Sequence, residues 1–205
     1  QQLSDDELAA IVDAAHSMGR RVTAHAHGAD GINAALRAGV DSIEHGTYLD
    51  RESVRQLRQG NRYLVPTLIA GWWVLQLAEQ GGVLTPAQEA KARQAGRDMA
   101  AMGRFARQNN VRIAFGTDSG VSPHGMNARE FALLVEAGFT PLQTIQMATV
   151  NAADHLQLGA VAGRIAPGFS ADVIAVDGDP LTDVAVLENG VRFVMARGGV
   201  ARNDQ

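Results

Sequence analysis

The sequence predicts an α/β protein in which parallel strands alternate with helices. Short apolar segments recur at 20–27, 40–46, 62–68 and 111–120, and three of them carry His or Asp near their ends. Segments of helical periodicity precede, separate and follow them, and three of these begin with a Ser or Thr cap. Strands and helices in this order pair in parallel through right-handed crossovers, which leaves two architectures open, a doubly wound sheet or a (β/α) barrel.

The helices can be placed from their caps and periods. Ser4 and Glu7 form a capping box, and apolar residues follow at helical spacing, so the first helix is expected from Ser4 to about Gly19. Thr85-Pro86 is a typical cap and first-turn pair and should open a helix of five or six turns. The other helices are expected at 28–38, 51–59, 127–138 and 140–156.

The last 45 residues break this rhythm. They contain short apolar segments separated by Gly, Pro and Asp turns, and no segment is long enough to form a crossover helix. We therefore expect two domains, an α/β domain over residues 1–160 and part of a small β domain over residues 161–205.

Composition excludes several classes of function. A net charge of −4 without a basic stripe argues against nucleic acid as a partner. The absence of cysteine excludes disulfides and thiolate ligands, so any metal must be held by nitrogen and oxygen atoms. No apolar run approaches 18 residues and no targeting segment is visible, so we expect no membrane partner and a cytoplasmic location.

Histidines and an aspartate end three of the predicted strands. Side chains alternate along a strand, so His25 and His27 should share one face, while His45 and Asp118 end later strands, each near a glycine-containing turn. A single such histidine is often a hydrogen-bonded structural residue. Several buried polar groups at one end of a sheet would each cost about 1–3 kcal/mol without partners, and a divalent metal such as zinc would satisfy them together.

The segments VTAHAHG, AGVDSIEHG, YLVPTL and FGTDSG, followed by AREFALLVEAGFTPLQTIQMATVNAA and GRIAPGFSADVIAVDGDPLTDV, resemble the amidohydrolase superfamily, in particular its imidazolonepropionase-like and prolidase-like branch. The resemblance implies a (β/α)8 barrel of the TIM type with one or two divalent metals, expected to be zinc. It implies that His25 is a metal ligand on the fifth strand, His45 a ligand on the sixth and Asp118 a ligand on the eighth. Asp118 would also move a proton from the attacking water to the leaving amine.

Three further residues are candidate substrate contacts. His27 lies beyond His25 toward the mouth of the barrel, and either a substrate contact or a structural role fits it. Tyr48 and His124 lie on loops after their strands, where they could contact substrate or anchor the loop.

The sequence also departs from the family. The His-x-His pair of the first barrel strand is missing, and the only lysine, Lys91, lies in a polar helix and does not match the carboxylated lysine of the two-metal branch. The chain therefore looks like the C-terminal half of an amidohydrolase, strands five to eight plus the C-terminal part of a small β-sandwich domain.

This half would belong to a metal-dependent hydrolase of C–N bonds that acts on a dipeptide or an N-acyl amino acid. The alternative is a non-catalytic fragment or subunit that pairs with a complementing half-barrel chain. In either case we expect the open sheet edges to be covered, by the missing N-terminal half, a complementing chain or a homo-oligomer.

Overall fold

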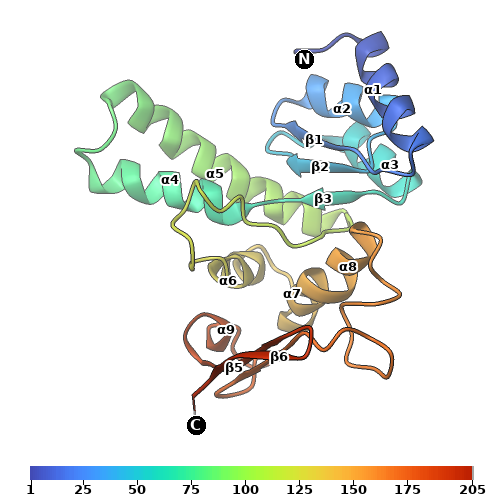
Figure 1. The fold of residues 1–205 in the computed structure, drawn as a ribbon. Helices are drawn as coiled ribbons and strands as arrows, with labels where there is room; N and C mark the ends of the chain where they lie inside the picture. Colours follow the sequence, from blue (N-terminus) through green and yellow to red (C-terminus); the bar gives the residue numbers. More distant parts are fainter. Residues whose placement is uncertain (205) are drawn as a thin grey trace.

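The computed structural model describes residues 1–204, and its N-terminal part is a parallel sheet with helices against it (Figure 1). The strands lie in the order β1 (Thr23–Ala26), β2 (Ser42–His45) and β3 (Tyr63–Val65). The helices of this part are α1 (Asp5–Ser17), α2 (Ala29–Ala38) and α3 (Arg51–Gln59). The predicted alternation of strands and helices is confirmed here, and all pairing is parallel.

The helix boundaries follow the predicted caps. In the capping box of α1 the Ser4 N–H donates to Glu7 Oε2 over 2.8 Å, and the Glu7 N–H donates to Ser4 Oγ over 3.3 Å. Helix α2 ends at Gly39, whose φ of 105° is open to glycine and costly for other residues. Helix α3 begins after Asp50, which accepts the Ser53 N–H over 2.8 Å.

The fourth predicted strand, residues 111–120, is much shorter than expected. Only Ile113 pairs with β3, through a single parallel bridge. Pro66 directly follows β3 and has no N–H with which to extend the ladder. The Phe115 N–H, which faces away from β3, donates to the Met147 carbonyl over 3.1 Å. The prediction of a full strand is therefore wrong, although Ile113 still lies parallel beside β3.

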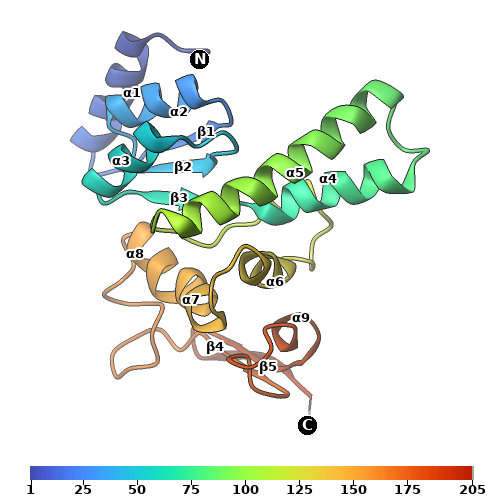
Figure 2. The same cartoon turned by 180° about the vertical axis from the view of Figure 1, so that it is seen from behind.

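Helices α4 (Leu68–Gln80) and α5 (Pro86–Gln108) form a hairpin that projects away from the sheet (Figures 1 and 2). The capping box at Thr85 predicts α5 correctly. Helix α4 begins with the apolar run LIAGWWVL, which shows no helical period, so the sequence carries no signal for it. The two helices approach closely at Gly96, where a Cβ atom would lie 2.7 Å from Leu75 Cβ.

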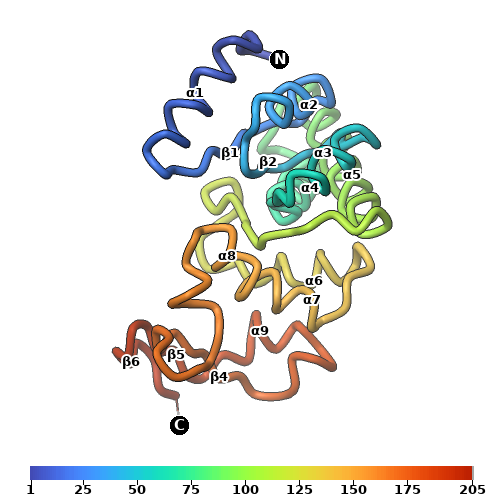
Figure 3. The backbone as a smooth tube through the Cα atoms, turned by 90° about the vertical axis from the view of Figure 1, so that its right-hand side faces the viewer, coloured from blue at the N-terminus to red at the C-terminus, as the bar shows by residue number. Residues whose placement is uncertain are grey.

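A helical layer follows the hairpin in the chain. It consists of α6 (Arg129–Glu136), α7 (Pro141–Gln146), the π-helical turn η1 (Met147–Asn151) and α8 (Ala152–His155). The last three elements form one continuous helix, as predicted for residues 140–156, apart from the wider turn in its middle. In the side view this layer lies between the parallel sheet and the C-terminal end of the molecule (Figure 3).

The C-terminal residues form a small antiparallel sheet. Its strands are β4 (Val173–Val176), β5 (Val191–Ala196) and β6 (Gly199–Asn203), in that order, with the short helix α9 (Val186–Asn189) beside them. This sheet lies at the end of the molecule opposite to β1–β3 (Figures 1 and 2). A small β element apart from the parallel sheet is therefore confirmed.

The main core lies where the parallel sheet meets the helices. Ile43, Leu64 and Ile69 are fully buried there and come from β2, β3 and α4. This packing holds the carboxyl ends of the strands against the start of α4. Within residues 1–204, no helix combines the length and the apolar character that crossing a lipid bilayer requires.

Candidate metal centre

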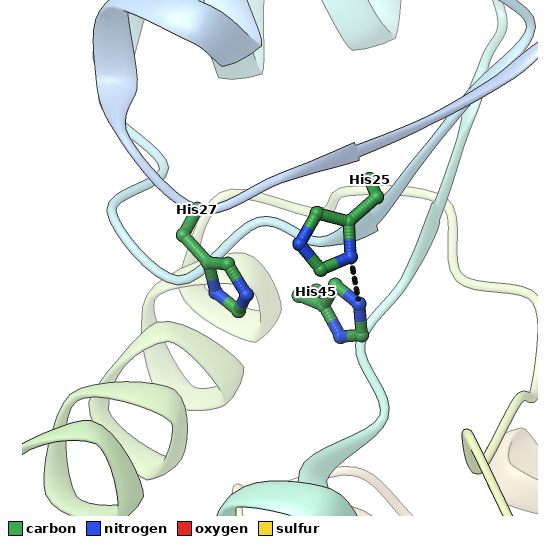
Figure 4. A group of neighbouring side chains, drawn as sticks. All are labelled: His25, His27 and His45. Carbon is green, nitrogen blue, oxygen red and sulfur yellow. Dashed lines mark hydrogen bonds between the residues drawn. The ribbon is translucent and has the colours of Figure 1, made fainter.

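Three imidazole rings meet at the carboxyl ends of β1 and β2 (Figure 4). The ring centroids of His25 and His45 are 4.5 Å apart, and the ring of His27 stacks on that of His45 at 4.8 Å with an interplanar angle of 10°. One possible ligand atom from each of His25, His27 and His45 lies within 4.8 Å of the other two. We call these three residues the histidine cluster.

Strand β1 and the residue directly after it place two of these rings by simple alternation. Ala24 and Ala26 face the core, and His25 and His27 lie on the opposite, more open face. The face predicted for these two histidines is therefore confirmed.

Strand β2 places the third ring by breaking alternation. A regular strand would turn His45 to the same side as Ile43, which lies in the core. His45 instead has φ 68°, in the left-handed region, and its Nε2 lies 2.9 Å from Nδ1 of His25. A backbone of this kind costs about 1–3 kcal/mol in a non-glycine residue and is typical of functional sites.

Buried threonine hydroxyls orient two of the rings. Thr67 Oγ1 lies 2.7 Å from His45 Nδ1, and Thr47 Oγ1 lies 2.8 Å from His27 Nδ1. Both threonines are buried. When Nδ1–H donates to the threonine hydroxyl, Nε2 keeps the lone pair that can bind a metal, which is how ligand histidines are usually oriented.

The electrostatics of the cluster favour neutral imidazoles. Burial lowers the pKa of His45 to about 4, with smaller contributions from His27 and His25, while Asp118 acts in the opposite direction. Burial is also the largest cause of the lowered pKa of His27. At neutral pH both rings therefore keep a free lone pair, which metal binding requires.

Asp118 lines the same cavity as two of the histidines. This cavity has a volume of about 270 Å³, and its lining includes His25, His45, Thr67 and Asp118. Like His45, Asp118 has a left-handed backbone, with φ 51°. The three predicted metal ligands are thus brought to one cavity, although within residues 1–204 the set of donor atoms within 4.8 Å of one another contains His27 and not Asp118.

Glu44 is a cavity residue that the sequence reasoning missed. It lies beside His25 in the register of β1 and β2, lines the same cavity, and accepts the hydroxyl of Thr23 over 2.6 Å. Burial raises the pKa of Glu44, and Asp118 adds to the rise. Alternation within SIEH places Glu44 on the same face as Ser42, away from Ile43, and this face pairs with His25 in the register. That alternation could have indicated Glu44. No sequence signal distinguishes Thr47 and Thr67 from other threonines.

The remaining predicted contacts lie outside this cavity. The Tyr48 hydroxyl donates to Asp98 of α5 over 2.8 Å, and the side chain is about half exposed. His124 is exposed on the loop between Asp118 and α6. Within residues 1–204, neither Tyr48 nor His124 is part of the cavity lining.

A parallel α/β unit with imidazoles and a carboxylate at its strand ends is the arrangement found at the C-terminal face of α/β barrel enzymes. Residues 1–201 match the sequence model described as the amidohydrolase family. The chain therefore belongs to the amidohydrolase family, in agreement with the resemblance of its motifs.

Individual relatives agree with this assignment. Ochratoxinase from Aspergillus niger is 36% identical over 192 residues, which are 91% of this chain and 38% of that protein. The crystal structure of a Xaa-Pro dipeptidase with bound methionine in the active site is 39% identical, with a TM-score of 0.93 over 98% of this chain and 50% of the dipeptidase. A prolidase complexed with N-methylphosphonate-L-proline is 29% identical, with a TM-score of 0.89 over 99% of this chain and 50% of the prolidase. The chain thus spans half or less of these relatives and falls in the prolidase-like branch.

Proposed function

We propose that these residues belong to a metal-dependent amidohydrolase that cleaves an amide or peptide bond in a dipeptide or an N-acyl amino acid. The observation that carries this proposal is the histidine cluster beside a cavity that Asp118 shares. Residues 1–160 would supply strands five to eight of a (β/α)8 barrel, and residues 161–205 the C-terminal part of a small β-sandwich domain. The similarity to a Xaa-Pro dipeptidase and an ochratoxinase supports this substrate class.

The donor set fits a zinc ion or a similar divalent metal. The nitrogens of His25 and His45 are 2.9 Å apart, close to the separation of about 3.3 Å expected for two nitrogens bound tetrahedrally to one zinc. We propose His25, His45 and Asp118 as the ligands. When bound, the metal would lower the pKa of a water molecule toward neutrality and so supply a nucleophile.

The side chains around this centre would perform the remaining steps. Asp118 would accept the proton of the attacking water and pass it to the leaving amine. Thr67 would hold the imidazole of His45 in place through Nδ1. His27, Tyr48 and His124 are proposed to contact the substrate on the open side, where Tyr48 would have to release Asp98.

The remaining ligands of the centre would come from outside these residues. Strand β1 forms one edge of the parallel sheet and has no partner beyond β2 within the described residues. This edge is where an N-terminal half of the same protein would continue the barrel. It also favours the second candidate, a non-catalytic subunit that pairs with a complementing half-barrel chain or with a second copy.

Metal analysis combined with intact mass tests both candidates. The protein should hold about one equivalent of Zn²⁺, which His25→Ala and Asp118→Ala should lose. His16→Ala is the matched control, because His16 pairs with Asp41 outside the cluster and should not affect binding. His27→Ala should keep the metal and raise KM for Xaa-Pro dipeptides if His27 contacts substrate.

The outcomes separate the two candidates. Zinc that is lost in the two ligand variants, together with hydrolysis of a dipeptide or N-acyl amino acid, supports the hydrolase. A folded protein without bound zinc, in a complex of larger mass, would reject the hydrolase for this chain and support the pairing subunit.

A further inference from the structure

Helix α4 begins without a cap of its own. Thr67 occupies the N-cap position, but its φ of 48° and ψ of 44° are left-handed, and its side chain makes no capping hydrogen bond. The hydroxyl is directed to His45 Nδ1 instead, at 2.7 Å. Because the Thr67 hydroxyl bonds to the imidazole, the first N–H groups of α4 lack the side-chain acceptor that an N-cap residue usually provides.

The carboxyl group of a residue on another helix supplies that acceptor. Glu130, in the first turn of α6, accepts the Leu68 N–H at Oε1 over 3.0 Å and the Ile69 N–H at Oε2 over 2.7 Å. Its side chain is fully buried. The two residues it binds directly follow Thr67 in the chain.

The environment of Glu130 shows how specialised this contact is. Burial raises the pKa of Glu130 to about 8, and the only opposing contributions come from the Leu68 and Ile69 N–H groups. When Glu130 is ionised, the positive end of the α4 dipole takes the place of a cationic side chain. Burying a carboxyl group without a cationic partner costs free energy. The two hydrogen bonds to Leu68 and Ile69 explain why Glu130 occupies this position.

We propose that Glu130 is a positioning residue for the metal centre. By binding both N–H groups at the start of α4, Glu130 holds Thr67 in its strained left-handed conformation, and Thr67 in turn holds the imidazole of His45. The inference rests on the proposed function in one respect only, the assignment of His45 as a ligand. The series of contacts from Glu130 through the start of α4 and Thr67 to His45 does not depend on that assignment.

The test uses the ¹⁵N chemical shifts of the His45 imidazole, recorded without metal at a pH above about 8, where Glu130 is ionised. These shifts report which ring nitrogen carries the proton, and a hydrogen bond from Nδ1–H to the Thr67 hydroxyl favours the tautomer protonated at Nδ1. Glu130→Gln keeps the size of the side chain but places an N–H₂ group against one of the two N–H donors. The expected result is a change from one tautomer to a mixture, together with a fall of about tenfold in Zn²⁺ affinity.

Two further variants separate positioning from general stability. Thr67→Val should change the His45 shifts as Glu130→Gln does, and the double variant should change them no further, because both substitutions break one chain of contacts. Glu136→Gln is the matched control, since Glu136 lies on the same helix with a largely exposed side chain. It should leave both readouts unchanged.

Each outcome decides the proposal. An unchanged His45 tautomer in folded Glu130→Gln, or additive effects with Thr67→Val, would overturn it. If Glu130→Gln does not fold, Glu130→Asp, which keeps both acceptor oxygens on a shorter side chain, should show a partial shift. Unfolding of both variants would assign Glu130 to general stability and reject the positioning role. If the wild-type protein binds no Zn²⁺, the proposed metal site is rejected. The ¹⁵N shifts would still show whether Glu130 positions the His45 ring.

Discussion

Gly46, the residue after His45, is a sensitive point of the site. It has φ 62°, so two consecutive residues at the end of β2 have left-handed backbones. A Cβ atom at Gly46 would lie 2.6 Å from Leu64 Cδ1 and 3.7 Å from Ile43 Cγ2. Leu64 and Ile43 are fully buried in the core and have little room to move.

The cost of Gly46→Ala can be worked out from these two features. A left-handed backbone costs an L-residue about 1–2 kcal/mol relative to glycine. Overpacking a filled core by one methyl group costs about 1–3 kcal/mol. We therefore expect Gly46→Ala to lower the free energy of unfolding by about 2–5 kcal/mol.

A second glycine separates the two contributions. Gly19 has nearly the same backbone, with φ 65°, but a Cβ atom there would meet nothing within 4 Å. Gly19→Ala should therefore cost only the conformational part, about 1–2 kcal/mol. Urea unfolding followed by circular dichroism measures both variants against the wild type. Equal destabilisation in the two variants would refute the argument that Leu64 resists a side chain at Gly46.

Two further predictions concern buried polar groups. Burial raises the pKa of Glu130 to about 8 from 4.5, so the folded protein keeps a proton that the unfolded chain releases between these values. The free energy of unfolding should therefore fall by at most about 1.4 kcal/mol per pH unit as the pH rises through this window. Glu130→Gln should reduce this dependence on pH, measured by urea unfolding at several pH values. A pH dependence unchanged by the substitution would contradict the argument. Tyr63→Phe should cost about 1 kcal/mol, because the buried Tyr63 loses its 2.6 Å hydrogen bond to Asp154. Tyr48→Phe, which loses a surface bond to Asp98, should cost less than about 0.5 kcal/mol, and an equal cost in both would count against the role of burial.

Much of the secondary structure could be read from local patterns. The capping boxes at Ser4 and Thr85 and the Gly39 stop mark helix ends that the structure reproduces. These signals work because a cap satisfies N–H groups within three residues of itself. Alternation likewise placed His25 and His27 on one face of β1, because the period of two belongs to the strand itself.

The sequence failed where a distant partner decides the local structure. The strand predicted over residues 111–120 is cut to one bridge because Pro66 offers no N–H beyond β3, and on its other side Phe115 bonds to Met147, which lies in no strand. Helix α4 has no visible cap because Glu130 supplies it from 62 residues away at Leu68. No local pattern contains either contact.

The sequence by itself determined the alternation of strands and helices over residues 1–65, the residue types at the strand ends and, through its motifs, the family. Only the tertiary structure decided how these residues meet. Alternation would have turned His45 into the core, and its left-handed backbone turns it to His25 instead. Tertiary packing also added Glu44 to the cavity and brought His27 within the histidine cluster. The physical reason is that periodicity sets directions within one element, whereas distances between elements depend on backbone angles at their ends and on the packing that holds them there.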